Sequence, residues 1–474
     1  MNNHTSELRD ILERSEADRL DAQKRSALLD RRNFVIRSFA GVGALTAVAA
    51  CGGGGDEAET PDLNAERNAS SGRNHPTPTL AATAPSGSAP SWAPASGDAT
   101  RVVTTANTFL SQNGNLAGWE SAFGKIVNDY SGGVFNPYWG SLGAMVFHGG
   151  GHAATFDNSV VILDLNDLTF KRLSTPTPSN NGANWIRTSS TQPLDPAFNR
   201  TYCEYGDAQP GSAHTYDTLA ILPPEDGGAP YGSLIRVSSH AVHFNLSRNT
   251  GWSHRFDFQS LMMRDGKWTR WSVNAPTSYL NPGACSAYDA KRKRFWWVAN
   301  LSSSPPGIRY LDVATQQQLE ARYTSTARWG PGASPDSPTL RYDPVRDILV
   351  LSCTVSGLFV LAYLRCASPQ LGWFRPALSA GIPILGGDSH PFDFVPEADK
   401  FVLLSRADTA AVYDIVVPQD PTQTWSVTRR PVSGAPIASV HVAGKRWSYC
   451  RAAKSFVWMA KSTSGVLAYR PFGV

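Results

Sequence analysis

The sequence predicts an all-β fold, a β-propeller of repeated four-stranded blades, and three observations support this prediction. Residues 101–474 hold almost all of the 14 Trp, 15 Tyr and 20 Phe of the chain, and aromatic side chains favour half-buried strands. Short strand-like runs recur with a spacing of 52 to 55 residues, which is typical of propeller blades. Turn residues separate neighbouring apolar runs, as in a series of hairpins.

An aromatic residue followed seven positions later by a large apolar residue sets this period. Four segments show the pattern: Tyr288–Phe295, Tyr342–Leu349, Phe394–Phe401 and Tyr449–Phe456. Asp, Pro and charged residues stand between the two positions, as expected for a tight turn exposed to water. Each segment therefore predicts a hairpin between two strands of one blade.

The number of blades follows from the period. About 370 residues divided by a period of about 53 gives seven blades. The stretch 174–285 is irregular, and if it forms one enlarged blade the ring has six. We expect seven blades, with six as the close alternative. The last repeat ends at Leu467–Arg470 without an outermost strand, so we expect the segment near 101–110 to supply it and to close the ring, which hides both sheet edges.

The first 51 residues resemble the signal of a lipoprotein exported by the twin-arginine route. Arg31 and Arg32 precede a mild apolar run at 38–50, which is shorter than a membrane-spanning helix requires. The run ends in Val-Ala-Ala-Cys51, which resembles a lipobox. The resemblance implies that the two arginines are read as an export signal and that Cys51 is lipidated. It implies an anchor in the bacterial cell envelope, at the outer membrane.

Composition divides the rest of the chain into two parts. Residues 52–100 are rich in Gly, Ala, Ser, Thr and Pro, and such a segment has too few apolar anchors to fold, so we expect a disordered tether. Residues 101–474 are the expected propeller. The net charge of +4 includes no long Lys/Arg block, so nucleic acid is not an expected partner. The lipid is the only membrane attachment that we expect.

Cysteine usage excludes several kinds of site. Apart from Cys51, five cysteines remain, so at least one thiol has no intramolecular partner, and the pairing of the others is open. The sequence has no Cys-x-x-Cys or Cys/His finger spacing. It predicts neither a metal site nor a cofactor.

One segment makes the fold more specific. Residues 145–152, 158–165 and 168–170 contain a glycine pair, an apolar strand and a closing aromatic residue. Together they resemble a kelch repeat of the galactose-oxidase type. The resemblance implies a propeller and supports the fold far more than a function.

Histidines give the best indication of a site. Six of the ten lie between residues 148 and 254. His148 and His152 flank three glycines, which let the backbone approach a ligand closely, so we expect His148, His214, Gly150 and Gly151 to bind substrate. Histidines that merely satisfy neighbouring carbonyls would give the same clustering.

The order of His152, Tyr216 and Arg236 resembles that of propeller polysaccharide lyases such as the ulvan lyases. The resemblance implies β-elimination beside a uronic acid. Arg236 would neutralise the carboxylate, and Tyr216 and His152 would share the roles of base and acid.

We therefore expect a carbohydrate-binding propeller whose ligand is a polysaccharide or oligosaccharide. If the protein is an enzyme, we expect a polysaccharide lyase that cleaves an acidic polysaccharide. The alternative is a non-catalytic, kelch-like module that binds a protein partner at the cell envelope. The sequence does not separate these two functions.

Overall fold

The computed structural model describes most of the predicted propeller, within a compact unit that spans Thr77–Val474. The described residues are 89–103, 126, 131–149, 157–177, 204–205, 207–237, 239–243, 246–250, 253–261, 263, 266–271, 285–298, 308–321, 336–355, 358–383, 390–405, 407–435, 444–459 and 465–474. Arg31, Arg32 and Cys51 lie outside them, as do Gly150, Gly151 and His152. In these ranges we find no helix with the length and apolar character needed to cross a membrane.

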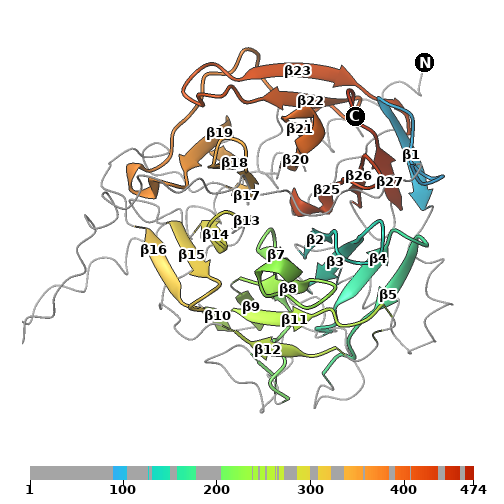
Figure 1. The fold of residues 1–474 in the computed structure, drawn as a ribbon, viewed down its shortest axis with the longest axis vertical. Coiled ribbons are helices and arrows are strands. Elements are labelled where there is room, and N and C mark those ends of the chain that lie inside the picture. Colours follow the sequence, from blue (N-terminus) through green and yellow to red (C-terminus); the bar gives the residue numbers. More distant parts are fainter. Residues whose placement is uncertain are drawn as a thin grey trace, which may run out of the picture. The chain divides into compact units, whose positions relative to one another are not determined.

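The described residues form six blades around a central axis, as Figure 1 shows. The strands are, in blade 1, β2 (Gly132–Asn136), β3 (Ala144–His148), β4 (Val161–Asp164) and β5 (Thr169–Arg172); in blade 2, β7 (Leu219–Leu222), β8 (Ser233–Arg236), β11 (His254–Asp257) and β12 (Trp268–Arg270); in blade 3, β13 (Ser286–Asp289), β14 (Arg294–Val298), β15 (Ile308–Asp312) and β16 (Gln318–Ala321); in blade 4, β17 (Asp336–Asp343), β18 (Ile348–Val355) and β19 (Leu358–Arg365); in blade 5, β20 (Phe392–Val395), β21 (Lys400–Leu404), β22 (Ala411–Val416) and β23 (Ser426–Pro431); and in blade 6, β25 (Trp447–Cys450), β26 (Ser455–Trp458), β27 (Val466–Tyr469), β1 (Asp98–Val103) and β24 (Ser433–Gly434). Short 3-10 helices are η3 (Pro224–Asp226), η4 (Pro369–Leu371), η5 (Pro396–Ala398) and η6 (Gly444–Arg446).

The all-β propeller is confirmed, but the preference for seven blades was wrong and the alternative of six is confirmed. The stretch 174–285 contributes one blade and a separate three-stranded sheet made of β6 (Ala213–His214), β9 (Ser239–His243) and β10 (Leu246–Thr250). The predicted number of blades was one too high because the length of the propeller included this inserted sheet.

Closure by an N-terminal strand is confirmed. β1 pairs antiparallel with β27, with Arg101 opposite Leu467, and the two strands lie side by side in Figure 1. The strand begins at Asp98, three residues before the predicted segment. The residues before β1 also contact the ring, because Trp92 Nε1 donates a hydrogen bond to Leu165 O of blade 1 at 3.3 Å. The part of the predicted segment after Val103 lies outside the described residues.

The repeated hairpins have a common register. In each of the four segments the aromatic residue is the cross-strand partner of the apolar residue seven positions later, as for Tyr288 with Phe295 and Tyr449 with Phe456. The residue two positions before the apolar one adopts a positive φ, between 47° and 55°, at Lys293, Asp347, Asp399 and Lys454. A left-handed residue there turns the chain tightly into the next strand.

The hydrophobic core lies between the blades, as six clusters that each join two neighbours. The middle strands of a blade are buried on both faces, and β3 and β4 accordingly read as continuous apolar runs. Representative pairs within the clusters are Phe147 and Val457, Val146 and Phe256, Ile235 and Phe295, Trp296 and Leu349, Val350 and Phe401, and Val402 and Phe456. Cys285, Cys353, Cys366 and Cys450 are buried, and none of them forms a disulfide within the described residues.

Candidate functional site

The sequence-predicted site residues that the structure describes lie where the innermost strands begin. His148 ends β3 and pairs with Gly132, the first residue of β2. Arg236 ends β8 and pairs with Leu219, the first residue of β7. His214 is the second residue of β6. The side chains of His148 and Arg236 are therefore brought together at the interface between blades 1 and 2.

His148 and Arg236 are in direct contact. Arg236 Nη1 lies 3.1 Å from His148 Nε2 and donates a second hydrogen bond to Gly211 O at 2.7 Å. Because a guanidinium cannot accept, His148 Nε2 is the acceptor, and Nδ1 donates to Ser159 O at 3.3 Å. Burial, reinforced by the positive charge of Arg236, holds the pKa of His148 well below its ordinary value. His148 is thus a neutral, fixed acceptor at pH 7.

A second histidine extends this polar cluster. His254 Nε2 lies 2.9 Å from Glu204 Oε1, and Arg270 Nη2 donates to Glu204 Oε2 at 2.6 Å. Burial lowers the pKa of His254 although Glu204 opposes the effect. Burial raises the pKa of Glu204, but the hydrogen bonds from His254 and Arg270 outweigh it, and the net shift is downward.

The polar cluster has almost no surface to offer a substrate. His148, Arg236 and His254 are each 0 % exposed, so contact between Arg236 and a substrate carboxylate would require neighbouring segments to move. Tyr216 is half-buried and has a positive φ of 37°, a conformation that costs free energy in a residue other than glycine. The side chain of His214 lies outside the described residues, as does all of His152. The expected roles of these residues remain predictions.

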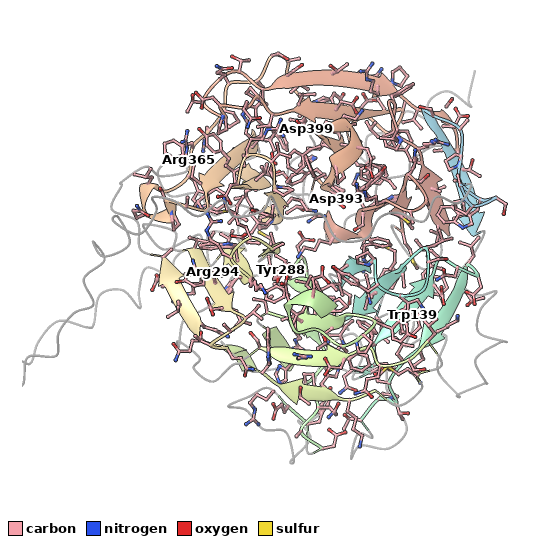
Figure 2. The ribbon with its side chains drawn as sticks, in the orientation of Figure 1. Trp139, Tyr288, Arg294, Arg365, Asp393 and Asp399 are labelled. Carbon is pink, nitrogen blue, oxygen red and sulfur yellow. The ribbon has the colours of Figure 1, made fainter. Side chains whose placement is uncertain are left out.

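The opposite ends of the innermost strands enclose a pocket on the ring axis, the axial pocket, with a volume of about 380 Å³. Every blade contributes to it, from the last residues of its innermost strand or from the segment beside that strand. Figure 2 places the labelled Tyr288 and Asp393 near the middle of the ring, whereas Arg365 lies at its periphery. A volume of this size suits a small ligand.

Aromatic rings and prolines form the wall of the axial pocket. The aromatic lining residues are Phe135, Tyr138, Tyr288, Tyr342 and Phe394. Three hydroxyl groups are held by carboxylates: Tyr288 donates to Asp226 Oδ2 at 2.6 Å, Tyr342 to Asp347 Oδ1 at 3.0 Å and Tyr138 to Glu225 Oε1 at 3.2 Å. Burial and the acidic neighbour raise the pKa of Tyr288, so the hydroxyl keeps its proton. The rings are therefore fixed before any ligand arrives.

The charged side chains of Arg341, Asp393 and Lys445 line the inner end of the pocket. Asp217 and Ser286 bond to them from below, and we call these five residues the floor. Lys445 Nζ donates to Asp217 O at 2.7 Å, Leu219 O at 2.6 Å and Ser286 Oγ at 2.8 Å. Its three protons are thereby placed. Burial lowers the pKa of Lys445 to about 8.

Arg341 connects the two carboxylates of the floor. Arg341 Nη1 lies 3.3 Å from Asp217 Oδ2, and Nε donates to Asp393 Oδ1 at 3.0 Å. Asp217 also accepts the Lys445 backbone N–H at 2.6 Å. Two cations and two carboxylates thus balance one another at the base of the pocket.

Ion pairs join neighbouring hairpins around the pocket, and we call them the hairpin ion pairs. They are Lys293 with Asp226 at 3.0 Å, Arg292 with Asp347 at 2.6 Å, Arg346 with Asp399 at 2.6 Å and Arg451 with Glu397 at 2.6 Å. Each pair links one blade to the next. The charged turn residues, which the sequence analysis assigned to exposed turns, therefore hold the wall of the pocket together.

Within the part of the chain that the structure describes, one group of side chains has donor atoms close enough for a metal. Ligand atoms of Asp289, Asp347 and Cys366 lie within 4.8 Å of one another. Arg292, however, donates to Asp289 Oδ2 at 2.9 Å and to Asp347 at 2.6 Å. Because a guanidinium already compensates both carboxylates, we assign this group to an ion-pair network.

The sequence did not predict the axial pocket, although it identified three of the residues that line it as part of the repeat. Tyr288, Tyr342 and Phe394 are the aromatic positions of the repeat. A residue that recurs at the same point of every blade lies at the same height along the ring axis. The repeat could therefore have predicted that these aromatic side chains surround one site. Lys445 and Asp217 belong to no repeated pattern.

No protein-family model matches the chain, and no curated protein sequence does. Among solved structures, the chain is similar to the major allergen Mala s 1 of Malassezia sympodialis, with a TM-score of 0.42 and 10 % identity over 73 % of this chain and 94 % of that one. It is also similar to auxiliary nutrient binding proteins of Bacteroides thetaiotaomicron (TM-score 0.40, 10 % identity, 73 % of this chain and 68 % of that one) and Bacteroides ovatus (0.37, 11 %, 72 % and 69 %). At this level of similarity the matches say nothing about function.

Proposed function

We propose that this protein is an exported, lipid-anchored β-propeller that binds a carbohydrate in its axial pocket. The observation that carries the proposal is a cavity of about 380 Å³ with fixed aromatic rings on its wall and polar side chains on its floor. A sugar ring has apolar C–H faces and polar hydroxyl edges, so it complements such a wall and floor. Rigid rings bind with little loss of conformational entropy.

The proposed location rests on the sequence. Arg31 and Arg32 would direct export, Cys51 would carry the lipid, and the predicted tether of residues 52–100, whose last residues 89–100 are described with the ring, would link the ring to the outer membrane of the envelope. A tether of polar and small residues allows a ring to search the space near a surface. A ligand met at the cell surface fits this arrangement.

Mutation of the pocket mouth tests the binding site. Ala290 is exposed and lines the pocket, so Ala290→Trp should fill the entrance without disturbing the core. Ala314→Trp is the matched control, because Ala314 is exposed on the same blade and does not line the pocket. We expect the detergent-solubilised protein to bind members of a glycan array, and Ala290→Trp alone to lose that binding. Equal binding by both variants would place the ligand elsewhere.

Cleavage of an acidic polysaccharide by β-elimination is the finer proposal that the lyase resemblance implies. It would take place at the other end of the ring, with His152, Tyr216 and Arg236 as catalytic residues. The complete burial of Arg236 does not support this proposal, because the guanidinium does not reach a substrate in the described conformation. Incubation with uronate-containing polysaccharides, followed by the ultraviolet absorbance of the unsaturated product, tests it, and activity that survives His152→Ala with Tyr216→Ala would assign the chemistry to other residues.

The alternative function is a non-catalytic module that binds an envelope protein. A pull-down from envelope extracts distinguishes it from carbohydrate binding, because a protein partner should be recovered in stoichiometric amount without added sugar. Recovery should also survive alanine at His152 and Tyr216.

A further inference from the structure

The floor of the axial pocket closes the ring axis. In Figure 1, β13 and β25 lie on opposite sides of the centre. Lys445, just before β25, reaches Ser286 of β13 at 2.8 Å. Arg341 of β17 reaches Asp217, just before β7, at 3.3 Å. These bonds join blade 6 to blade 3 and blade 4 to blade 2 through the centre of the ring. They leave no passage for a polymer along the axis, so a chain that enters the pocket in that direction has to end there.

The charges of the floor give no preference for an acid. The protons of Lys445 Nζ are already donated to Asp217 O, Leu219 O and Ser286 Oγ, and Arg341 pairs with the carboxylates of Asp217 and Asp393. A carboxylate on the ligand would therefore find the protons of Lys445 already donated and Arg341 already paired, and it would lie against Asp393. Repulsion between like charges at short range in a partly desolvated pocket disfavours it.

Asp393 is the part of the floor best placed to bind a hydroxyl group. Its side chain is 22 % exposed, against 9 % for Arg341 and 1 % for Asp217. Oδ1 accepts from Arg341 Nε and from the Phe394 N–H, both at 3.0 Å, whereas Oδ2 accepts from the Tyr449 N–H at 2.9 Å. A carboxylate has about four acceptor positions, so Oδ2 can accept one more hydrogen bond.

We infer that the axial pocket binds the terminal residue of a neutral saccharide chain, with Asp393 accepting a hydroxyl hydrogen bond from it. This inference rests on the proposed function and makes it more specific. The aromatic wall holds the sugar ring, the closed floor admits only a chain end, and the unpaired acceptor position of Asp393 selects a hydroxyl over a carboxylate.

Calorimetry with matched oligosaccharides tests the inference at low ionic strength. The probes are neutral oligomers of glucose, galactose and mannose, from trimer to hexamer, and the uronate oligomers of the same sugars. We expect a neutral oligomer to bind at least about tenfold more tightly than its uronate counterpart, with an affinity per chain that is independent of length. Uronates that bind as well, or an affinity that rises with the number of residues in the chain, would overturn the inference and leave carbohydrate binding intact.

A charge-removing variant separates the role of Asp393 from that of the pocket as a whole. Asp393→Asn should bring the affinity for uronates up toward that for neutral oligomers, because the like charge is gone. Glu397→Gln is the matched control, since Glu397 belongs to the adjacent hairpin and pairs with Arg451 instead of lining the pocket. An unchanged preference in Asp393→Asn would overturn the role of Asp393. If no saccharide binds the wild-type protein, the proposed function itself fails.

Discussion

Lys445 Nζ of blade 6 lies 2.8 Å from Ser286 Oγ of blade 3, on the far side of the ring axis. The ammonium group is buried and also donates to the carbonyls of Asp217 and Leu219 in blade 2. One side chain therefore connects three blades through the centre of the ring. Because Lys445 both lines the pocket and joins three blades, its bonds contribute to the shape of the pocket and to the stability of the propeller.

Lys445→Met should lower the free energy of unfolding by about 3–5 kcal/mol, because it removes the cation beside the buried Asp217 carboxylate. Ser286→Ala removes one acceptor and should cost only about 1 kcal/mol. Urea unfolding followed by tryptophan fluorescence measures both. Equal losses in the two variants would show that the charge of Lys445 contributes nothing beyond a single hydrogen bond.

The hairpin ion pairs should be worth more than an ordinary surface pair. Arg292 bridges Asp289 and Asp347 with its side chain only 17 % exposed, so Arg292→Met should cost about 2–3 kcal/mol of unfolding free energy. Arg365→Met is the control, because the Arg365–Asp420 pair is 3.7 Å long with both side chains well exposed, and loss of an exposed pair should have a much smaller effect on unfolding. The same unfolding experiment decides between them.

Acid should destabilise the ring through its buried histidines. Burial and Arg236 lower the pKa of His148, and burial lowers that of His390 to about 4, whereas an unfolded histidine titrates near 6.5. Below about pH 6.5 the unfolded state therefore binds more protons, and stability present at pH 7.5 is lost as the pH falls. His148→Gln should reduce the loss between pH 6.5 and 5 by up to about 1.4 kcal/mol per pH unit. Thermal unfolding at several pH values measures it, and parallel curves for both proteins would contradict the assignment.

The affinity for a saccharide should depend on the position of the aromatic side chains in the pocket wall as well as on their presence. Tyr288→Ala removes an aromatic face and should weaken saccharide binding by about tenfold or more, a loss of about 1.4 kcal/mol. Tyr288→Phe keeps the ring but loses the hydrogen bond to Asp226 and should weaken binding by a smaller factor. Tyr310→Ala is the control, because Tyr310 lies in β15 of the same blade under Arg294 and outside the pocket. Calorimetry with the tightest array ligand gives the three affinities.

The N-terminal signal makes a separate prediction. Cys51→Ala should prevent lipid attachment and cleavage before residue 51, and Arg31→Lys with Arg32→Lys should block export, because lysine lacks the planar guanidinium. Labelling with a clickable fatty acid and fractionation of the envelope measure both steps. Lipid incorporation that persists in Cys51→Ala would refute the lipoprotein assignment, and normal export of the double-lysine variant would refute the twin-arginine assignment.

The fold was predictable from local chemistry that every blade repeats. The seven-residue spacing between Tyr342 and Leu349 reflects a cross-strand pair in a tight hairpin, and sequence reports such pairs directly. The first two blades do not show this spacing because their hairpins are longer. Phe135 pairs with Met145, ten positions later, and Ile221 pairs with Leu234, thirteen positions later.

The site was less predictable, because it depends on contacts between distant segments. Lys445 and Asp217 meet across 228 residues of sequence, and neither carries a local signature. The clustered histidines were the stronger sequence signal, yet His148 and His254 lie in a buried polar cluster between two blades. Residue type and clustering identify polar groups, but burial decides whether they reach solvent.

The pairing of β1 with β27 also dictates an order of assembly. β1 leaves the ribosome before any blade exists, and its partner is synthesised more than 360 residues later. Its edge therefore stays open throughout translation, and the closing contact carries the largest loop-closure entropy in the ring. Folding of blade 6 should be the slowest step, and a chain that stops before β27 should stay open and aggregate through its unpaired edges.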